Sequence, residues 1–596
     1  MPDERPPELA LTDHLAEDRL ETWGEIASYL GREIRTVQRW EKTMALPVRR
    51  LTGGPDNVPR VFALKSEIDA WRRKHEVVKS ATPSSEHAVP STAGSDPTTA
   101  TKKEEKSPSL LQRRSVQVVL VVVITALMTI GIPKLVEWLW PSRAVLGVRP
   151  FRNLGEQAEA FIPAGLTEEM VARLGQLHPD RLMVVPITDA PRAARVSSPN
   201  VRVDYILQGT VRRISDQVAI TAQLIQTNNQ TVVWGNSYER DVKDLLRVQT
   251  EVADAIVSEV FNKLPHATAP AREVNRDAYL AYLEGRYFWN RRTADSIQKA
   301  VVLFQKSIAA DSTYAPAYAG LADCYELLGS APYTAMPPRQ AFPQAKAAAR
   351  KALELDERLA EAHVSLGYAY LAYEWNFAGA DREFKRALEL RPSYATAHQY
   401  YGYFLTAAGQ LQKAIDQRKT AVDLDPLSPL MASALGEAYY QARQFDQTIA
   451  QNQRALSLDP AYAIALVNIG RAYQQKGMHV EAQAAFQKIL AVVPDDPAVL
   501  ALLGHENAIS GRRDDALQAI AKLNDLAAHR YVPAIYYALV YTGLGDRNEA
   551  FHWMDAAVNE RTEYLIYLNS DPLADPLRGD SRFPALMKRV GIPFNR

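Results

Sequence analysis

The feature that most constrains the fold of this chain is a period of thirty-four residues in its second half. Small residues keep this step in three series: Gly402, Gly436, Gly470 and Gly504; Gly477, Gly511 and Gly545; Ala482, Ala516 and Ala550. Prolines keep the same step at Pro392, Pro426, Pro460 and Pro494. Small side chains let paired helices approach closely, and a proline fits after a helix end. The period therefore predicts stacked helix pairs that wind into a superhelix with a concave inner surface.

Individual repeat units can be read directly, as in GEAYYQARQFDQTIAQNQRALSLDP and GRAYQQKGMHVEAQAAFQKILAVVP. These units resemble the tetratricopeptide repeat. The resemblance implies an all-α superhelix of about eight helix pairs over residues 275–560, which binds a protein or peptide partner. Residues 561–596, including DPLADPLRGDSRF, are expected to form the terminal cap that such a superhelix needs.

The residue after each small position is expected to line the concave surface. These residues are Tyr368, Tyr403, Glu437, Arg471 and His505. Aromatic and charged groups along one line suit an extended peptide or a folded partner. The alternative is that they are ordinary exposed side chains. Cys324 is expected to be a buried small apolar residue, and as the one cysteine it excludes an internal disulfide.

An uncharged apolar run, VQVVLVVVITALMTIGI, occupies residues 116–132. With Trp138 and Trp140, which suit a membrane interface, it predicts one transmembrane helix over residues 115–140. A buried core helix or strand is the alternative. Five basic residues lie before the run, at Lys102, Lys103, Lys106, Arg113 and Arg114, and fewer follow it closely. The positive-inside rule then places the amino terminus in the cytoplasm. The polar first residues indicate no cleaved signal peptide.

Residues 20–75 are predicted to form a winged helix-turn-helix. ETWGEIASYLG and EIRTVQRWEKTM read as two amphipathic helices joined at Gly31, and LPVRRLTGGPDNVPRVFA reads as a wing before the helix KSEIDAWRRK. From Gly31 to Lys74 there are eleven Lys and Arg residues and five acids. That excess suits the phosphates of DNA. The alternatives are a solvated basic face or attraction to anionic lipid.

WGEIASYLGREIRTVQRWEKTMALPVRR is similar to the helix-turn-helix of the MerR/excisionase type. The resemblance implies a set of DNA-facing residues on the second helix and the wing: Arg35, Thr36, Gln38, Arg39, Lys42, Arg49 and Arg50. Glu33 and Ile34 depart from the family, because a small polar residue often caps the second helix there. Residues 76–112 are rich in Ser, Thr, Pro and Ala and are predicted to form a disordered linker.

Residues 143–265 are predicted to form an α+β domain. YILQGTVRRI, QVAITAQLIQ and TVVWGNSYER alternate apolar and polar residues as strands do, whereas FIPAGLTEEMVARLGQL reads as a helix. These stretches, with VLGVRPFRNL, resemble the TolB amino-terminal-like domain, which implies a module for binding or packing. We expect Gly165 and Gly209 to serve tight backbone turns.

The sequence lacks the motifs of common catalytic sites. It has no G-x-x-x-x-G-K-S/T, no H-E-x-x-H and no C-x-x-C. The adjacent acids Glu168–Glu169 and Asp495–Asp496 are expected at helix starts, where the helix dipole favours them. We therefore expect no catalytic residue, no metal ligand and no cofactor, and predict that the chain is not an enzyme.

These observations together predict a multidomain chain with a winged helix-turn-helix, one transmembrane helix, an α+β domain and a tetratricopeptide superhelix. The predicted function is a single-pass regulator of the bacterial inner membrane, which couples binding of a periplasmic ligand or protein to DNA binding in the cytoplasm. Signalling would run through clustering or a homodimer, because a single helix beside a flexible linker transmits small shifts poorly. The alternatives are a membrane-anchored scaffold for an envelope complex and a soluble cytoplasmic protein.

Overall fold

The structure is a computed structural model of the chain, which describes residues 19–20, 22–30, 34–44, 46–51, 60–76, 144–177, 181–187, 203–261, 274–330, 333 and 335–592. The chain divides into two units, Met1–Ser115 and Val116–Arg596, and each is described here by itself. The expected linker beyond residue 76 and the expected transmembrane segment at residues 115–140 lie outside the described residues. No helix within the described ranges combines the length and apolar character that a bilayer crossing needs.

The described residues of the first unit form three helices and a small antiparallel sheet. Its described elements are β1 (Arg19–Leu20), α2 (Trp23–Leu30), α3 (Ile34–Met44), β2 (Arg49–Leu51), β3 (Arg60–Leu64) and α4 (Lys65–Glu76), with the strands in the order β1-β3-β2. The apolar residues predicted at helical spacing meet in one core, where Ile26, Val37 and Ile68 are fully buried. The rings of Trp40 and Trp71 lie 5.6 Å apart beside it.

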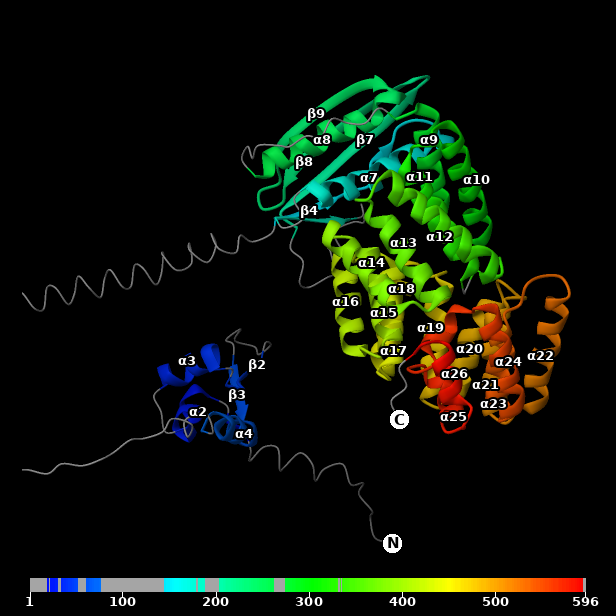
Figure 1. The fold of residues 1–596 in the computed structure, drawn as a ribbon. Helices are drawn as coiled ribbons and strands as arrows, with labels where there is room; N and C mark the ends of the chain where they lie inside the picture. The colour runs from blue at the N-terminus through cyan, green and yellow to red at the C-terminus, as the bar shows by residue number, and fades with distance from the viewer. Residues whose placement is uncertain are drawn as a thin grey trace, which may run out of the picture. The chain divides into compact units, whose positions relative to one another are not determined.

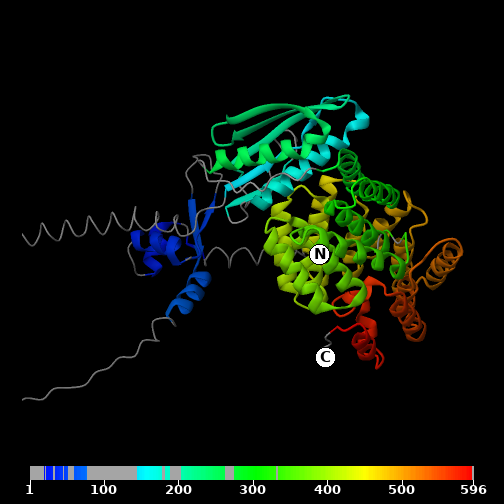
Figure 2. The same ribbon diagram turned by 45° about the horizontal axis from the view of Figure 1, so that its top comes forward.

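The second unit begins with a mixed sheet. Its elements are β4 (Ala144–Val148), β5 (Arg152–Asn153), η3 (Gln157–Glu159), α7 (Phe161–Leu177), β6 (Leu182–Pro186), β7 (Tyr205–Ile214), β8 (Gln217–Gln226), β9 (Thr231–Asp241), η4 (Val242–Asp244) and α8 (Leu245–Val260). The strand order is β6-β4-β7-β8-β9, and β5 also pairs with β7. Helices α7 and α8 pack beside each other on one face of this sheet (Figure 2).

Two glycines of this domain lie inside regular elements, so the expectation of tight turns at Gly165 and Gly209 is wrong. Gly165 lies inside α7, near its start, where a Cβ atom would come within 2.7 Å of Leu283 Cδ2. Gly209 lies inside β7, where a Cβ atom would overlap the ring of Phe151. Both glycines therefore permit close packing between elements, a use that the sequence around them does not distinguish from a turn.

The remainder of the described chain forms eight successive helix pairs and a final segment (Figure 1). The pairs are α9 (Arg276–Trp289) with α10 (Ala294–Ala310), α11 (Ala315–Gly329) with α12 (Pro338–Leu355), α13 (Ala360–Ala369) with α14 (Phe377–Leu390), α15 (Ala395–Ala407) with α16 (Leu411–Leu424), α17 (Pro429–Gln441) with α18 (Phe445–Leu458), α19 (Ala463–Gln475) with α20 (His479–Leu490), α21 (Pro497–Ile509) with α22 (Arg513–Ala527), and α23 (Ala534–Leu544) with α24 (Arg547–Glu560). The first helix of each pair packs against the first helix of the next. The first helices therefore form what we term the inner face. Cys324 lies on α11 and is fully buried, as predicted.

The thirty-four-residue period is confirmed at the turns between paired helices. Every turn from α13 onward has one residue in the left-handed region of φ, and these residues are Trp375, Gly409, Arg443, Gly477, Gly511 and Gly545. Glycine adopts this conformation without steric cost, which explains its recurrence. Trp375 thus extends the period one turn further toward the amino terminus than the glycines do, and Arg443 fills the position between Gly409 and Gly477.

One repeat carries an extra residue. Gly367 and Gly402 occupy equivalent sites but are thirty-five residues apart, whereas Trp375 and Gly409 keep the step of thirty-four. The difference lies in η5 (Tyr370–Glu374), a π-helical turn that follows α13 directly. A π turn accommodates one additional residue without breaking the helix. This turn keeps the later helix pairs in register.

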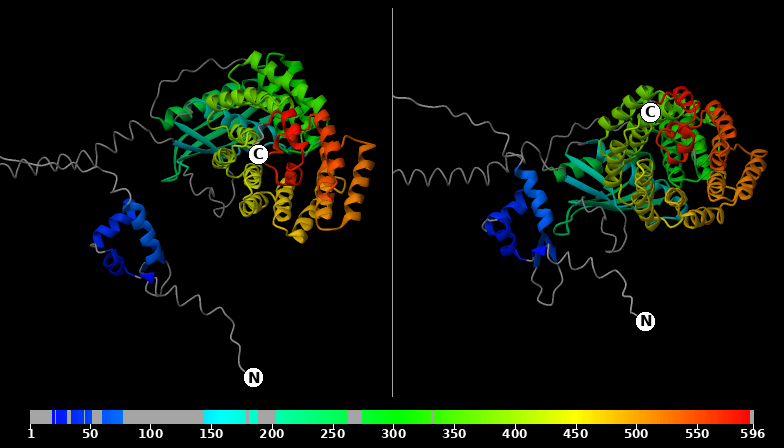
Figure 3. Two further views of the ribbon diagram at one scale, coloured as in Figure 1. Left: turned by 60° about the horizontal axis from the view of Figure 1, so that its bottom comes forward. Right: turned by 90° about the horizontal axis from the view of Figure 1, so that it is seen from below.

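The C-terminal segment (residues 561–592) contains η6 (Glu563–Tyr567), η7 (Pro572–Ala574), α25 (Asp575–Arg578) and α26 (Phe583–Arg589). Its last helix contacts the final pair, since Arg589 pairs with Asp555 on α24. It also reaches helices far back in the chain, because η6 contacts η5 and α15. Figure 3 shows this segment in red, between the earlier repeats in green and the last repeats in orange. The segment therefore does more than cap the last pair.

Candidate DNA-binding and partner-binding surfaces

The first candidate surface is the outer side of α3. Arg35 and Arg39 lie one helical turn apart and are exposed, and Thr36 and Gln38 beside them are half-buried. On the opposite side of the helix Val37 faces the core. The described part of the helix begins at Ile34.

The other predicted DNA-facing residues are placed by backbone alone. Lys42 lies in α3, and Arg49 and Arg50 lie in β2 opposite Phe62 and Val61 of β3. Their side chains are outside the described part of the structure. The structure therefore brings Arg35 and Arg39 together on one face and places the two wing arginines on an antiparallel hairpin.

The second candidate surface is the inner face of the repeats. The five residues predicted to line a concave groove lie on first helices of their pairs or directly beside them: Tyr368, Tyr403, Glu437, Arg471 and His505. Three of them are buried, however, whereas Tyr403 and Glu437 are half-buried. Tyr368, Arg471 and His505 are exposed by only 9%, 7% and 4%. Residues of the C-terminal segment contact Tyr368 and Arg471 directly, so the groove is occupied by the chain's own end.

The best-defined contact in the groove is a buried ion pair. Arg471 on α19 donates from Nη2 to Asp571 Oδ2 over 2.6 Å, and the Asp571 side chain is fully buried. The Tyr564 hydroxyl donates to the same oxygen over 2.5 Å. The Arg471 guanidinium also lies 4.1 Å from the ring centre of Tyr440. Asp571 thus binds at a site formed by Arg471 and Tyr440 of the inner face and Tyr564 of its own segment.

Two further inner-face residues contact polar partners. Tyr368 donates its hydroxyl to Glu563 of the C-terminal segment, and burial raises the pKa of this tyrosine well above its usual value. His505 shares a 2.9 Å hydrogen bond with Gln474 Nε2, and burial lowers the pKa of the imidazole to about 4. His505 is therefore a neutral core residue at neutral pH.

The first pairs of the repeat array are covered by α7 of the α+β domain. Glu168 accepts from Arg286 Nε over 2.9 Å, and Arg286 also donates to Asp323 over 3.1 Å. Glu169 accepts from the Tyr282 hydroxyl over 2.7 Å, and burial raises the pKa of Glu169 to about 7. These contacts join two domains through buried charges.

The two pairs of adjacent acids have different roles. The expectation that Glu168 and Glu169 mark a helix start is wrong, because α7 begins at Phe161. Both acids lie in the middle of α7 and face α9. Asp496 is the predicted helix-start acid, since its side chain accepts from Ala498 N and Val499 N, each over 3.0 Å.

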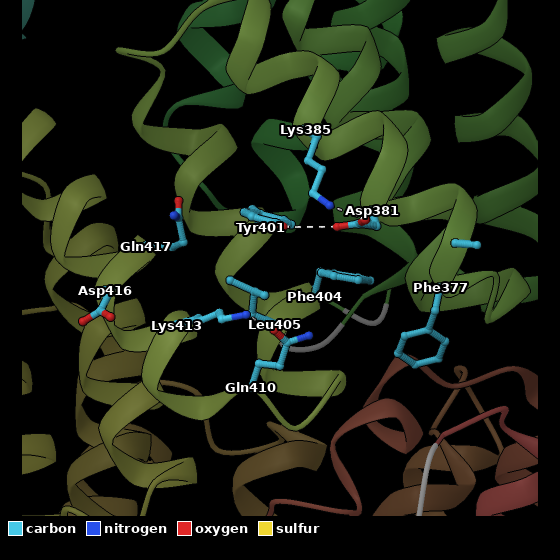
Figure 4. Close-up of a pocket in the computed structure, with 11 residues that line it drawn as sticks. Phe377, Asp381, Lys385, Tyr401, Phe404, Leu405, Gln410, Lys413, Asp416 and Gln417 are labelled. Atoms are coloured by element: carbon cyan, nitrogen blue, oxygen red, sulfur yellow. Dashed lines mark hydrogen bonds and ion pairs between the residues drawn. The ribbon is translucent and has the colours of Figure 1, made fainter.

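One open pocket lies on the repeats, and sequence reasoning missed it. Its volume is about 590 Å³, and it lies between α14, α15 and α16 (Figure 4). The Tyr401 hydroxyl donates to Asp381 over 3.1 Å at its edge, and Lys385 donates to the other oxygen of Asp381 over 2.7 Å. The rings of Tyr401 and Phe404 stack 5.7 Å apart in its wall. The cluster of aromatics around residue 401 was the available signal.

Comparisons with known proteins support the repeats. A family model of the tetratricopeptide repeat matches residues 439–505, which run from α17 into α21. The transcriptional regulator HilA of Salmonella typhimurium is 26% identical over 295 residues, which is 48% of this chain and 52% of that protein. The putative adenylate cyclase 3 of Rhizobium meliloti is 27% identical over 193 residues, 30% of this chain and 32% of that protein. The chain thus spans about half and a third of these relatives.

Solved structures with similar helical repeats include a thermophilic tetratricopeptide protein of Thermus thermophilus, at 21% identity and a TM-score of 0.29, covering 33% of this chain and 98% of that one. A human IFIT1 dimer with PPP-AAAA is 19% identical at a TM-score of 0.36, covering 52% of this chain and 78% of that one. With the observed helix pairs and the family match, the second half of the chain is a tetratricopeptide-type repeat.

Proposed function

We propose that this chain is a membrane-anchored one-component transcription regulator, in which the first unit binds DNA and the repeats bind a protein or peptide. The observation that carries the proposal is the exposed arginine face of α3, at Arg35 and Arg39, on a chain whose second half is a partner-binding type of repeat. The proposal includes no catalytic step, metal or cofactor.

In this proposal α2 and α3 act as a helix-turn-helix. A major groove admits one α-helix, and the second helix of such a pair enters it. Arg35 and Arg39 would contact phosphates or guanine edges, and Gln38 would lie between them on the same face. The hairpin of β2 and β3 would act as the wing, with Arg49 and Arg50 beside the backbone of the DNA.

The anchoring part of the proposal rests on sequence. The apolar residues 116–132 would cross the inner membrane of a bacterium, with the first unit in the cytoplasm and the repeats in the periplasm. Because a flexible linker would separate the first unit from the membrane, binding of a ligand would act by pairing or clustering two chains. Pairing raises the effective concentration of one DNA-binding unit near the other.

The similarity to HilA supports a regulator in general terms. The 295 aligned residues are more than the first unit contains, so the similarity includes residues outside that unit. It therefore supports the class of protein and leaves the DNA contacts to experiment.

Genome-wide mapping of DNA bound by the full chain tests the proposal. We expect the double variant Arg35→Ala with Arg39→Ala to lose site-specific occupancy. The matched control is Lys65→Ala with Arg72→Ala, which removes the same charge from α4 of the same unit. Occupancy that both variants retain, or both lose equally, would refute a specific role for α3. Protease added to intact spheroplasts tests the orientation, because a periplasmic repeat domain would be cleaved.

A second candidate function is a membrane-anchored scaffold. It is favoured by the family match at residues 439–505, since tetratricopeptide repeats assemble proteins without any need for DNA. Under this alternative the arginine variants of α3 leave all copurifying envelope proteins in place and change no promoter occupancy. A pull-down from membranes, compared with the promoter occupancy of the wild type and the α3 variant, separates the two, because only the regulator loses promoter occupancy in the variant.

A further inference from the structure

The C-terminal segment lies on the inner face as a ligand would. Three of its acidic side chains meet hydrogen-bond donors from different repeats: Glu563 meets Tyr368 at the end of α13, Asp571 meets Arg471 on α19, and Asp575 meets Arg443 after α17. Between the first two acids, Leu565, Ile566 and Leu568 are fully buried. An acidic segment with aliphatic residues therefore fits this surface across several repeats (Figure 3).

The inner face offers more donors than the segment uses. Arg471 reaches Asp571 through Nη2, whereas its Nε is buried and has no acceptor among the described residues. The Tyr440 ring lies 4.1 Å from this guanidinium. An arginine can hold a carboxylate by two parallel hydrogen bonds, which are stronger than one. A carboxylate from another molecule could thus be bound better than Asp571 is.

We propose that the inner face is a binding surface for an acidic peptide segment, and that the C-terminal segment is its resident occupant, which the incoming segment displaces. This rests on the proposed function, in which the repeats bind a partner, and it names the class of that partner. A resident segment competes at a high effective concentration because it is part of the same chain. The wild-type chain should therefore bind a free acidic peptide weakly until the resident segment is loosened.

The test uses the full chain and a fluorescent peptide with the sequence of residues 561–578, RTEYLIYLNSDPLADPLR. Asp571→Asn removes the charge that Arg471 holds, and the peptide can supply it again. We expect this variant to bind the peptide roughly tenfold more tightly than the wild type does, measured by fluorescence anisotropy. The matched control is Asp580→Asn, which removes an acid of the same segment whose partner is the nearby Arg582.

Two further chains decide where the peptide binds. Arg471→Met combined with Asp571→Asn should lose the gained affinity, because the proposed partner of the carboxylate is gone. In a chain with Gln441→Cys, Ser570→Cys and Cys324→Ala, oxidation to a disulfide would tie the C-terminal segment to α17, where Ser570 Oγ lies 2.7 Å from Gln441 Oε1. Peptide binding should fall after this cross-link, whereas each single cysteine should leave it unchanged.

Three results would overturn the proposal. One is equal peptide affinity in the wild type, Asp571→Asn and Asp580→Asn. Another is binding that survives Arg471→Met but disappears with Tyr401→Ala, which would place the peptide in the pocket between α14, α15 and α16. The third is a peptide without its three acids that binds as well as the acidic one.

Hydrogen exchange shows whether the Asp571→Asn variant is still folded. If Asp571→Asn loses protection in α9–α16 and so misfolds, the same comparison is made with Asp575→Asn, whose side chain is 38% exposed and pairs with Arg443. Absence of any gain in that variant counts against the proposal. Promoter occupancy is not read in this assay, so failure of DNA binding and failure of peptide binding remain distinguishable.

Discussion

Replacing Arg418 tests whether the two central repeats require polar side chains at core sites where neighbouring repeats have phenylalanine. Position 418 belongs to a series at a step of thirty-four that reads Phe384, Arg418, Asn452 and Phe486. Each of these side chains faces a glycine on the first helix of its own pair. The two phenylalanines are fully buried and Arg418 is exposed by only 1%. Arg418 therefore occupies a site that an aromatic ring fills in neighbouring repeats.

The magnitude follows from the partners of Arg418. Its Nη1 donates to Ala434 O over 2.7 Å and lies 3.5 Å from Glu437, while Nε and Nη2 have no partner among the described residues. Truncation to alanine removes this charge-assisted bond and leaves a cavity, so we expect a loss of about 3–5 kcal/mol. Arg418→Phe removes a poorly satisfied buried charge and refills the space. We expect it to be clearly less destabilising than Arg418→Ala, because no cavity is left.

The assay is urea-induced opening of the full chain, followed by hydrogen exchange in peptides from α15 to α18. Exchange reads the local free energy, which a single unfolding transition of a multidomain chain does not. Phe486→Ala is the control for a lost aromatic and should cost about 3–5 kcal/mol. The reasoning is refuted if Arg418→Phe destabilises the repeats as much as Arg418→Ala does, since Arg418 would then make contacts that a ring cannot replace.

Three other predictions follow from buried groups. Burial raises the pKa of Glu169 to about 7 in the folded chain. The stability that this group contributes is therefore full below its unfolded pKa of about 4.5 and is lost as pH rises through 7. Glu169→Gln should flatten that part of the profile of Tm against pH. The pKa of His505 is lowered to about 4, so folding loses about 3 kcal/mol as pH falls from about 6.5 toward 4, and His505→Gln should remove this loss from the acid limb of the same profile. Glu168→Ala leaves Arg286 with Asp323 alone, and limited proteolysis should then cut between α8 and α9 faster than in Glu159→Ala, whose partner Arg213 lies within the α+β domain.

The sequence predicted the repeats well because their determinants are local. A glycine at a turn and a small residue at a helix crossing depend on neighbours within one repeat, so Gly477 and Ala482 could be placed without knowledge of the rest. The left-handed conformation of Arg443 could be inferred only by extending the period, since arginine carries no such signal of its own.

The environment of the inner face could not be predicted in the same way. Periodicity shows which side of a helix Tyr368 or Arg471 faces, but it does not show what covers that side. The covering residues come from sequence distances of 195 for Tyr368 with Glu563 and 100 for Arg471 with Asp571. The C-terminal segment forms short turns with little helical periodicity, so its pattern indicated a cap and gave no register against distant helices. The acids of α7 were misjudged for the same reason, because Arg286 is 118 residues from Glu168.

The two segments that flank the repeats hold the inner face from opposite ends. On one side α7 places Glu168 against Arg286, and on the other the C-terminal segment places Asp571 against Arg471. Between them lie α16 to α19, whose cores contain Arg418 and Asn452 where other repeats have phenylalanine. Buried polar groups gain less from packing than aromatic rings do, so these pairs depend more on the flanking segments. A partner that displaced the C-terminal segment would therefore release the restraint nearest the weakest part of the array. Binding and a change in the curvature of the repeats would then be one event.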